Sequence, residues 1–306
     1  MSALAQHPSH VGAQRLGHPH DRAQSRALST RDLTSGYRNV PVVRSVNVDI
    51  PPGKITVIVG ANACGKSTLL KTMARIIPTI SGATVLDGHA ITAIPTKELA
   101  RQLGMLPQHP LAPEGITVAD LVGRGRHPHQ RLFRAWSGED AQIVAESLEA
   151  TGIADLAQRS IDELSGGQRQ RVWIAMALAQ RTDVLLLDEP TTFLDLTHQV
   201  EVLDLLTDVN RERGTTVVMV LHDINLAARY ADHIIAMRNG QVEAEGAPRE
   251  VVTEQMVYSV LGLRAQVIAD PVSGTPLIVP IGRHHAAGGE AQFALKGVPQ
   301  EGFGND

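Results

Sequence analysis

The sequence predicts an α/β fold: a doubly wound parallel sheet, preceded by an antiparallel β subdomain and interrupted by an inserted helical subdomain. Short apolar runs that end in polar residues predict strands buried on both faces. These runs span 51–60, 183–190 and 214–223. Segments with helical periodicity alternate with them, which is typical of a parallel sheet covered by helices. The expected helices lie near 67–76, 139–151, 167–181 and 196–212.

The first residues, 1–26, are rich in His, Pro, Gln and Ala without periodicity, which predicts a disordered tail. Four histidines in it are candidates for weak metal binding. Their spacing is irregular and no cysteine or carboxylate cluster joins them, so a solvated tail is the favoured interpretation. These histidines are His7, His10, His18 and His20. After the tail, the patterns over 27–50 predict antiparallel strands.

Three later segments depart from the alternation of strands and helices. The block from about 110 to 165 has helical patterns without buried-strand runs, so we expect an inserted helical subdomain there. Residues 266–283 predict a C-terminal β-hairpin, with its turn near Val272–Pro276. The Gly- and Ala-rich residues 284–306 predict a flexible tail. The main domain is therefore expected to span 27–265.

Composition narrows the class of protein. The chain has 306 residues, of which 43% are hydrophobic, as in ordinary globular domains. A formal net charge of −4 argues against a general nucleic-acid binder. The single cysteine, Cys64, excludes an intrachain disulfide. Because no apolar run approaches the roughly 20 residues of a membrane-spanning helix, we expect a cytoplasmic chain that reaches a membrane through a partner.

The segment GANACGKST lies between a predicted strand and a predicted helix, the context that a phosphate-binding loop requires. Its backbone N–H groups are expected to wrap phosphates, with Lys66 on the β and γ oxygens and the Ser67 hydroxyl on Mg²⁺. The alternative is a glycine-containing turn that binds nothing. The pattern predicts a P-loop NTPase, and the expected nucleotide-binding residues are Gly60, Ala61, Asn62, Ala63, Cys64, Gly65, Lys66, Ser67 and Thr68.

Polar residues follow three of the predicted strands. Asp188 and Glu189 end a buried strand, and ligands gather at the carboxyl ends of strands in a doubly wound sheet. Asp188 is therefore a candidate Mg²⁺ partner, and Glu189 a candidate base for a water that attacks the γ-phosphate. His222 and Gln108 also follow strands, and are candidates for contacting the γ-phosphate, the water or Mg²⁺. An acidic strand cap and a structural histidine are the plainer alternatives.

A second helix start with the character of an anion-binding site lies at ELSGGQ. Ser165 can cap the helix, and Gly166 and Gly167 leave the backbone accessible. No lysine or catalytic acid pair accompanies these residues, so they form only half of a site. Together with Gln168, they are expected to contact the γ-phosphate bound to a second copy of the chain.

These motifs, in this order, resemble an ATP-binding cassette (ABC) ATPase, with a RecA-like parallel core, over roughly 28–265. The resemblance identifies Gln108 with the Q-loop, Leu164–Gln168 with the signature motif, and Thr192–Asp195 with the D-loop. It likewise identifies the acids with the Walker B motif and the strand-end histidine with the switch histidine. It implies ATP and Mg²⁺ as ligands, and it gives Tyr37 a role in stacking on adenine. An ordinary exposed tyrosine is the alternative.

Further details resemble the ATPases of bacterial iron–siderophore importers. They include GRGRHPHQ and DPVSGTPLIVP. The resemblance implies a homodimer that binds two ATP molecules between its copies. It also implies two integral-membrane permease subunits, a substrate-binding protein, and a peripheral location on the cytoplasmic face of the inner membrane. The helical subdomain is expected to dock the permeases, with a basic cluster that either serves this docking or is a solvated surface. The cluster comprises Arg124, Arg126, Arg131 and Arg134.

Other functions stay open. The ATPase of a haem, cobalamin or metal-ion transporter shares the core motifs, as do exporters. Non-transport ABC proteins in translation or DNA maintenance are a different class. Against them, only one phosphate loop is present, and heptads and cysteine pairs are missing. The loop wording also departs from the commoner GPNGSGKST at Ala61, Ala63 and Cys64. Alanine at 63 is expected to need a backbone conformation open to L-residues.

Overall fold

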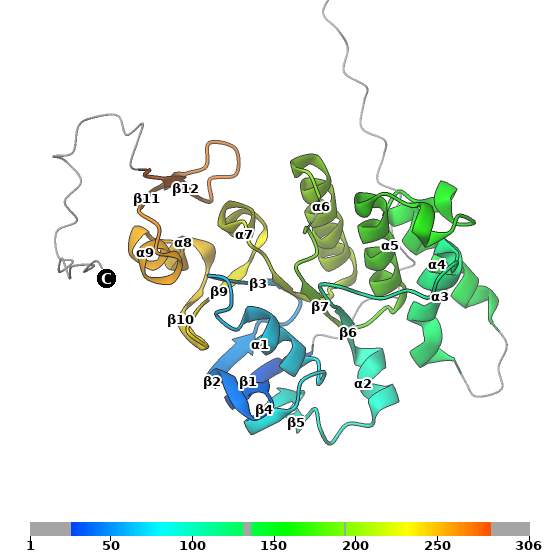
Figure 1. Ribbon diagram of the computed structural model, residues 1–306, viewed down its shortest axis with the longest axis horizontal. Helices are drawn as coiled ribbons and strands as arrows, with labels where there is room; N and C mark the ends of the chain where they lie inside the picture. The colour runs from blue at the N-terminus through cyan, green and yellow to red at the C-terminus, as the bar shows by residue number, and fades with distance from the viewer. Residues whose placement is uncertain (1–25, 131–135, 193, 283–306) are drawn as a thin grey trace, which may run out of the picture.

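The computed structural model describes residues 26–130, 136–192 and 194–282 (Figure 1). The predicted disordered tail, with its four histidines, lies outside the described residues apart from Arg26. The predicted C-terminal tail lies outside them too, as do Arg131 and Arg134 of the basic cluster.

The centre of the molecule is a six-stranded sheet in the order β10-β9-β3-β8-β7-β6. Its strands are β3 (Ile55–Gly60), β6 (Leu103–Leu106), β7 (Val184–Asp188), β8 (Thr216–Val220), β9 (His233–Arg238) and β10 (Gln241–Gly246). The first five of these run parallel, and β10 pairs antiparallel with β9 at one edge. The predicted fold class is confirmed. The sequence did not predict β9 or the edge strand β10.

Alternate residues of the central strands pack into two separate cores, one on each face of the sheet. On β7, Leu185 and Leu187 belong to one core and Val184 and Leu186 to the other. The first core is covered by α5 (Gly166–Ala179), α6 (Leu196–Arg213) and α7 (Ile224–Tyr230). The second is covered by α1 (Lys66–Met73) and the N-terminal sheet (Figure 1). This double burial explains why the strands are apolar throughout.

The N-terminal sheet is antiparallel, with strand order β2-β1-β4-β5. It comprises β1 (Leu28–Tyr37), β2 (Val40–Ile50), β4 (Thr79–Leu86) and β5 (His89–Ala90). The strands β1 and β2 are joined at Arg38 and Asn39, both with positive φ (50° and 61°), as in a type I′ hairpin turn. The sequence predicted β1 and β2 but not β4 and β5, nor α2 (Thr96–Gln102), which follows them.

Between β6 and α5 the described residues form helices. These are α3 (Val118–Gly123), α4 (Gly138–Ala150) and the short 3₁₀ turns η1 (Arg124–His129), η2 (Ala154–Leu156) and η3 (Ile161–Glu163). Arg126 was expected on a surface, either for docking or in contact with solvent. It is only 5% exposed, so both interpretations are wrong for this residue. Its guanidinium pairs with Asp140 at 2.9 Å and donates to the carbonyl of Ala179. It therefore joins three helical segments inside the subdomain.

The chain continues from β10 through α8 (Pro248–Val251) and α9 (Glu254–Leu261) to an antiparallel hairpin. The hairpin consists of β11 (Ala265–Ala269) and β12 (Pro276–Pro280), and it lies beside α7 and α9 (Figure 1). Among the described residues, no helix combines the length and the apolar character needed to cross a membrane.

Candidate functional site

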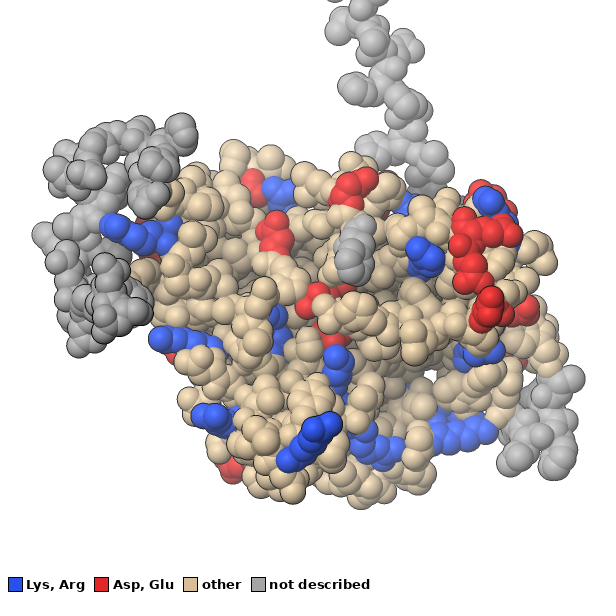
Figure 2. All heavy atoms as spheres, in the orientation of Figure 1, with Lys and Arg blue, Asp and Glu red and all other residues tan. Residues whose placement is uncertain are grey.

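A cleft of about 580 Å³ lies at the carboxyl edge of the central sheet. It is lined by Val42, Asn62, Ala63, Gly65, Lys66, Ser67, Thr68, Gln108, Glu189 and His222. The cleft therefore joins most of the predicted phosphate loop to the residues that follow β6, β7 and β8. On the viewed face of the molecule, Lys and Arg predominate along the lower edge, whereas acidic side chains gather near the middle and over the helices on the right (Figure 2).

The loop between β3 and α1 depends on two glycines with positive φ. Gly60 has a φ of 152°, and a Cβ there would lie 2.4 Å from the carbonyl oxygen of Met237. Gly65, at a φ of 107°, precedes the first turn of α1. The Lys66 ammonium folds back over the loop and donates to the carbonyls of Gly60 and Ala61, both at 2.9 Å. The loop thus holds a buried lysine through two of its backbone carbonyls.

Ala63 adopts a φ of 60°, in the left-handed region. The conformation is open to L-residues, as expected for alanine at this position, but only within a small allowed region. This region is small for residues with a Cβ and costs roughly 1–2 kcal/mol relative to a right-handed conformation. Cys64 beside it is buried, and burial raises the pKa of its thiol despite the opposing charge of Lys66. A raised pKa disfavours the thiolate, so this cysteine is poorly suited to be a nucleophile.

Asp188 ends β7 with its side chain buried. One carboxylate oxygen accepts a 2.7 Å hydrogen bond from the Ser67 hydroxyl, and the other lies 3.1 Å from the Lys71 ammonium. Hydroxyl and carboxylate oxygens are hard donors of the kind that Mg²⁺ prefers. The sequence analysis missed Lys71, although it lies four residues after Ser67 and therefore on the same face of α1.

Glu189 sits next to Asp188 in a left-handed conformation, with φ 57°. Three side chains hold its carboxylate. The Gln108 amide nitrogen donates at 2.6 Å, the Thr192 hydroxyl donates at 3.0 Å, and Nε2 of His222 lies at 2.7 Å. A positive φ in a residue with a Cβ is a strained conformation of the kind that clusters at functional sites.

The pKa of Glu189 reflects two opposing effects. Burial raises it, whereas the hydrogen bond from His222 lowers it, with help from the bonds of Thr192 and Gln108. The net effect is a pKa below that of an ordinary glutamate. The carboxylate is therefore ionised at neutral pH, as a proton acceptor must be.

Two sets of predicted residues lie apart from this cleft, whereas Gly60, Ala61, Cys64 and Asp188 do not line it but adjoin residues that do. Tyr37 ends β1 with about half of its surface exposed (53%), and the cleft reaches the same sheet only through Val42 of β2. The signature residues begin α5 instead. Ser165 and Gln168 form a capping box: the hydroxyl accepts from the Gln168 N–H at 3.2 Å, and the amide oxygen accepts from the Ser165 N–H at 3.0 Å.

Known proteins resemble this chain in sequence and in fold. Residues 43–192 match the family described as "ABC transporter". The chain is 51% identical to the "Probable siderophore transport system ATP-binding protein YusV" of Bacillus subtilis (strain 168), with 89% of this chain and 98% of that protein covered. It is 52% identical to the "Ferric enterobactin transport ATP-binding protein FepC" of Escherichia coli (strain K12), with 84% and 94% covered.

Among solved structures, the dimeric ABC transporter cassette MJ0796 resembles this chain with a TM-score of 0.66 and 30% sequence identity. The similarity covers 72% of this chain and 98% of that one. The comparison of folds and the comparison of sequences therefore point to the same family.

Proposed function

The chain belongs to the ABC transporter ATP-binding family, and from that premise we propose that it powers the import of iron–siderophore complexes through separate membrane permeases. The observation that carries the proposal is the cleft, which joins a phosphate loop to an ionised, strained glutamate. The printed functions of the two relatives, siderophore transport and ferric enterobactin transport, support the substrate class.

ATP binds with its phosphates in the loop Gly60–Thr68. The Lys66 ammonium, now on the carbonyls of Gly60 and Ala61, transfers its hydrogen bonds to the β and γ oxygens. Tyr37, at the end of β1, stacks on the adenine. Ser67 and Asp188, whose oxygens lie 2.7 Å apart, would hold Mg²⁺, and Gln108 would be a further candidate ligand through its amide oxygen. When bound, Mg²⁺ neutralises charge on the β- and γ-phosphates.

Hydrolysis uses the cluster around Glu189. The carboxylate accepts a proton from a water molecule as its oxygen attacks the γ-phosphorus, and the bond to the β-phosphate oxygen breaks to release ADP. Without ATP, Nε2 of His222 contacts the carboxylate from one side; with ATP bound, it donates to a γ-phosphate oxygen instead. Gln108 holds it from the other side, which keeps the base oriented toward the water.

Two copies of the chain bind two ATP molecules between them. The signature residues Ser165, Gly166, Gly167 and Gln168 of one copy contact the γ-phosphate on the loop of the other. In one chain they lie apart from the lining of the cleft. Ser165 already caps the Gln168 N–H, so Gly166 and Gly167 supply the N–H groups that a helix start leaves without an i−4 carbonyl. The dimeric structure of the similar cassette MJ0796 supports the dimer.

The dimer works with two integral-membrane permeases and a substrate-binding protein, on the cytoplasmic face of the inner membrane. The test is uptake of radioactive iron as a siderophore complex in cells that lack the gene. The wild-type gene is expected to restore uptake, whereas Lys66→Ala is expected to leave it at background. Normal uptake in the deletion strain would contradict the proposal. Cobalamin uptake, measured in parallel, distinguishes the alternative substrate.

A further inference from the structure

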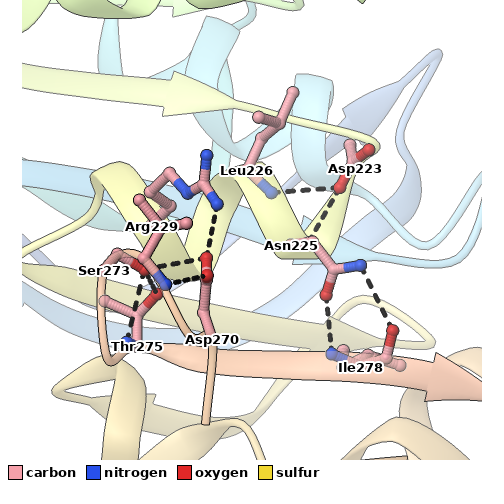
Figure 3. Close-up of polar contacts among 9 residues, drawn as sticks. Asp223, Asn225, Leu226, Arg229, Asp270, Ser273, Thr275 and Ile278 are labelled. Carbon is pink, nitrogen blue, oxygen red and sulfur yellow. Dashed lines mark hydrogen bonds and ion pairs between the residues drawn. The ribbon is translucent and has the colours of Figure 1, made fainter.

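The C-terminal hairpin is fastened to the first turn of α7 by one asparagine (Figure 3). The side-chain nitrogen of Asn225 donates to the carbonyl of Ile278 at 3.2 Å, and the Ile278 N–H donates to the side-chain oxygen at 2.7 Å. An amide side chain carries the same donor and acceptor as a peptide group. Asn225 therefore pairs with β12 as a neighbouring strand would, and it links the helix to the backbone of the hairpin.

A second attachment lies one turn later on the same face of α7. Arg229 forms an ion pair with Asp270, at the start of the hairpin turn (Figure 3). The same carboxylate accepts from the Val272 N–H and the Ser273 hydroxyl, both at 2.9 Å. The hydrogen bond from Arg229 is the largest influence on the pKa of Asp270, which lies well below its usual range. The turn and the helix are thus held by one buried, ionised carboxylate.

The start of α7 fixes the backbone of His222. Only Leu221, His222 and Asp223 separate the end of β8 from α7. Asp223 caps the helix, because its carboxylate accepts from the N–H groups of Asn225 and Leu226 at 2.8 and 3.0 Å. Since β8 is held in the middle of the sheet, a shift of α7 has to be absorbed by this short link. The imidazole would then move relative to Glu189, which it now meets at 2.7 Å.

We propose that Asn225, Arg229 and Asp270 are positioning residues that hold α7 against the C-terminal hairpin and so keep His222 in place at the ATP site. The proposal rests on the proposed function, in which His222 acts on the γ-phosphate. None of the three residues lines the cleft, so their effect passes through the helix.

A purely structural role is the alternative, because Leu226, Ala227 and Ala228 of α7 are buried and anchor the helix in the core. If that anchor is sufficient, loss of the hairpin bonds lowers the melting temperature and leaves the kinetics of the folded protein unchanged. The positioning role predicts a loss of kcat without a loss of ATP binding. Small displacements of a catalytic group cost rate in this way.

The experiment compares Asn225→Ala and Arg229→Met with wild type, in the full chain and well below the melting temperature. We expect each variant to lower the kcat of ATP hydrolysis about tenfold, with KM and the Kd for ATP changed by less than about twofold. Gln266→Ala is the matched control, because Gln266 is exposed on the same hairpin and pairs with Val279 rather than with α7. Arg229→Lys keeps the charge and is expected to recover at least half of the lost kcat.

Hydrogen exchange gives a second readout that does not depend on hydrolysis. In Asn225→Ala, amides of residues 222–230 are expected to exchange faster, while those of 60–70 keep their wild-type rates. An unchanged kcat, or a rise in KM at constant kcat, would overturn the proposal, as would unchanged exchange at 222–230. Full activity of Glu189→Gln would instead refute the catalytic part of the proposed function, the assignment of Glu189 as the base, whereas the exchange result at 222–230 tests the positioning of α7 independently.

Discussion

The phosphate loop and the signature motif are both helix starts suited to anions, yet they differ in what surrounds them. At the phosphate loop, Lys66 is 5% exposed and Asp188 1% exposed, and Ser67 bonds that acid directly. At the signature, Ser165 and Gly166 are exposed, and the Ser165 hydroxyl accepts from the Gln168 N–H of its own helix start. The first site has a lysine, two acids and a cleft, whereas the second has only a helix N-terminus.

A helix start that can bind a phosphate is therefore not by itself a catalytic site. The charged residues proposed to bind the phosphates and Mg²⁺ and to activate the water all lie on the phosphate-loop side. Lys66 begins α1, and Asp188 and Glu189 lie at the end of β7. The signature side can contribute only the N–H groups and hydroxyl that approach a phosphate already held elsewhere. In the proposed homodimer, both sides are present twice, and each phosphate loop would form one complete site with the signature motif of the other copy.

The largest expected effect comes from removing the proposed base on the phosphate-loop side. Glu189→Gln keeps the shape of the side chain but cannot accept a proton. We expect kcat to fall at least about 100-fold, with the Kd for ATP unchanged within about twofold. ATP should also hold the variant as a dimer, which sedimentation can measure. Residual hydrolysis at the wild-type rate would exclude Glu189 as the base.

The second largest effect is expected on the signature side. Ser165→Arg places a bulky cation where the partner's phosphate should lie, so hydrolysis is expected to fall at least about 100-fold. ATP binding to the monomer is expected to stay normal, because Ser165 does not line the cleft. Equilibrium binding of a fluorescent ATP analogue measures ATP binding to the monomer, and a steady-state assay measures hydrolysis. Weakened binding to the monomer would show that the signature belongs to the same chain's site.

One glycine-to-alanine substitution on each side distinguishes an effect on stability from an effect on ATP binding or hydrolysis. Gly60→Ala places a Cβ 2.4 Å from the Met237 carbonyl, so we expect a loss of about 1–3 kcal/mol in the free energy of unfolding, together with loss of ATP binding. At Gly166, a Cβ meets no atom within 4 Å. Gly166→Ala is therefore expected to leave stability unchanged within about 0.5 kcal/mol and to lower hydrolysis.

Denaturant unfolding and steady-state hydrolysis of the two variants provide the measurements. Equal losses of stability in both variants would show that the glycines have the same structural role, and the contrast between the two sides would then fail.

The smallest effect is expected at the C-terminal hairpin, which belongs neither to the phosphate-loop side nor to the signature side, and it concerns the free energy of unfolding. The pKa of Asp270 is lowered in the folded protein, so its ion pair stabilises the fold above the ordinary aspartate pKa of about 3.9 and loses that contribution as pH falls through the folded pKa. Arg229→Met is expected to be less stable than wild type at pH 7, and the difference is expected to shrink below about pH 4. Urea unfolding at both pH values measures it. A difference that grows on acidification would contradict the assignment.

The sequence was sufficient to predict the parts of the site that depend on spacing along the chain. The loop Gly60–Thr68 and the acids at 188 and 189 follow from a strand, a turn and a helix in fixed order, and the structure brings them together with Gln108 and His222. The capping role of Ser165 was also predictable, because the capping box is a local pattern.

Features that depend on tertiary packing were not predictable in the same way. Arg126 looked like a surface charge but is buried against Asp140, because α4 packs over it. The strand β4 was missed, since its register with β1 is interrupted between Arg31 and Thr34 and its alternation is broken. The left-handed conformation of Ala63 has no signal in the sequence beyond the unusual residue itself.

The central claim is that one ATP site takes its phosphate loop and its signature from two different copies. Mixing two inactive chains tests it: Lys66→Ala, which lacks a working loop, and Ser165→Arg, which lacks a working signature. Each mixed dimer then contains one intact site, so an equal mixture is expected to regain about a quarter of the wild-type hydrolysis rate. If mixed dimers form and hydrolysis stays at background, the loop and the signature do not complete each other between copies, and the claim is wrong.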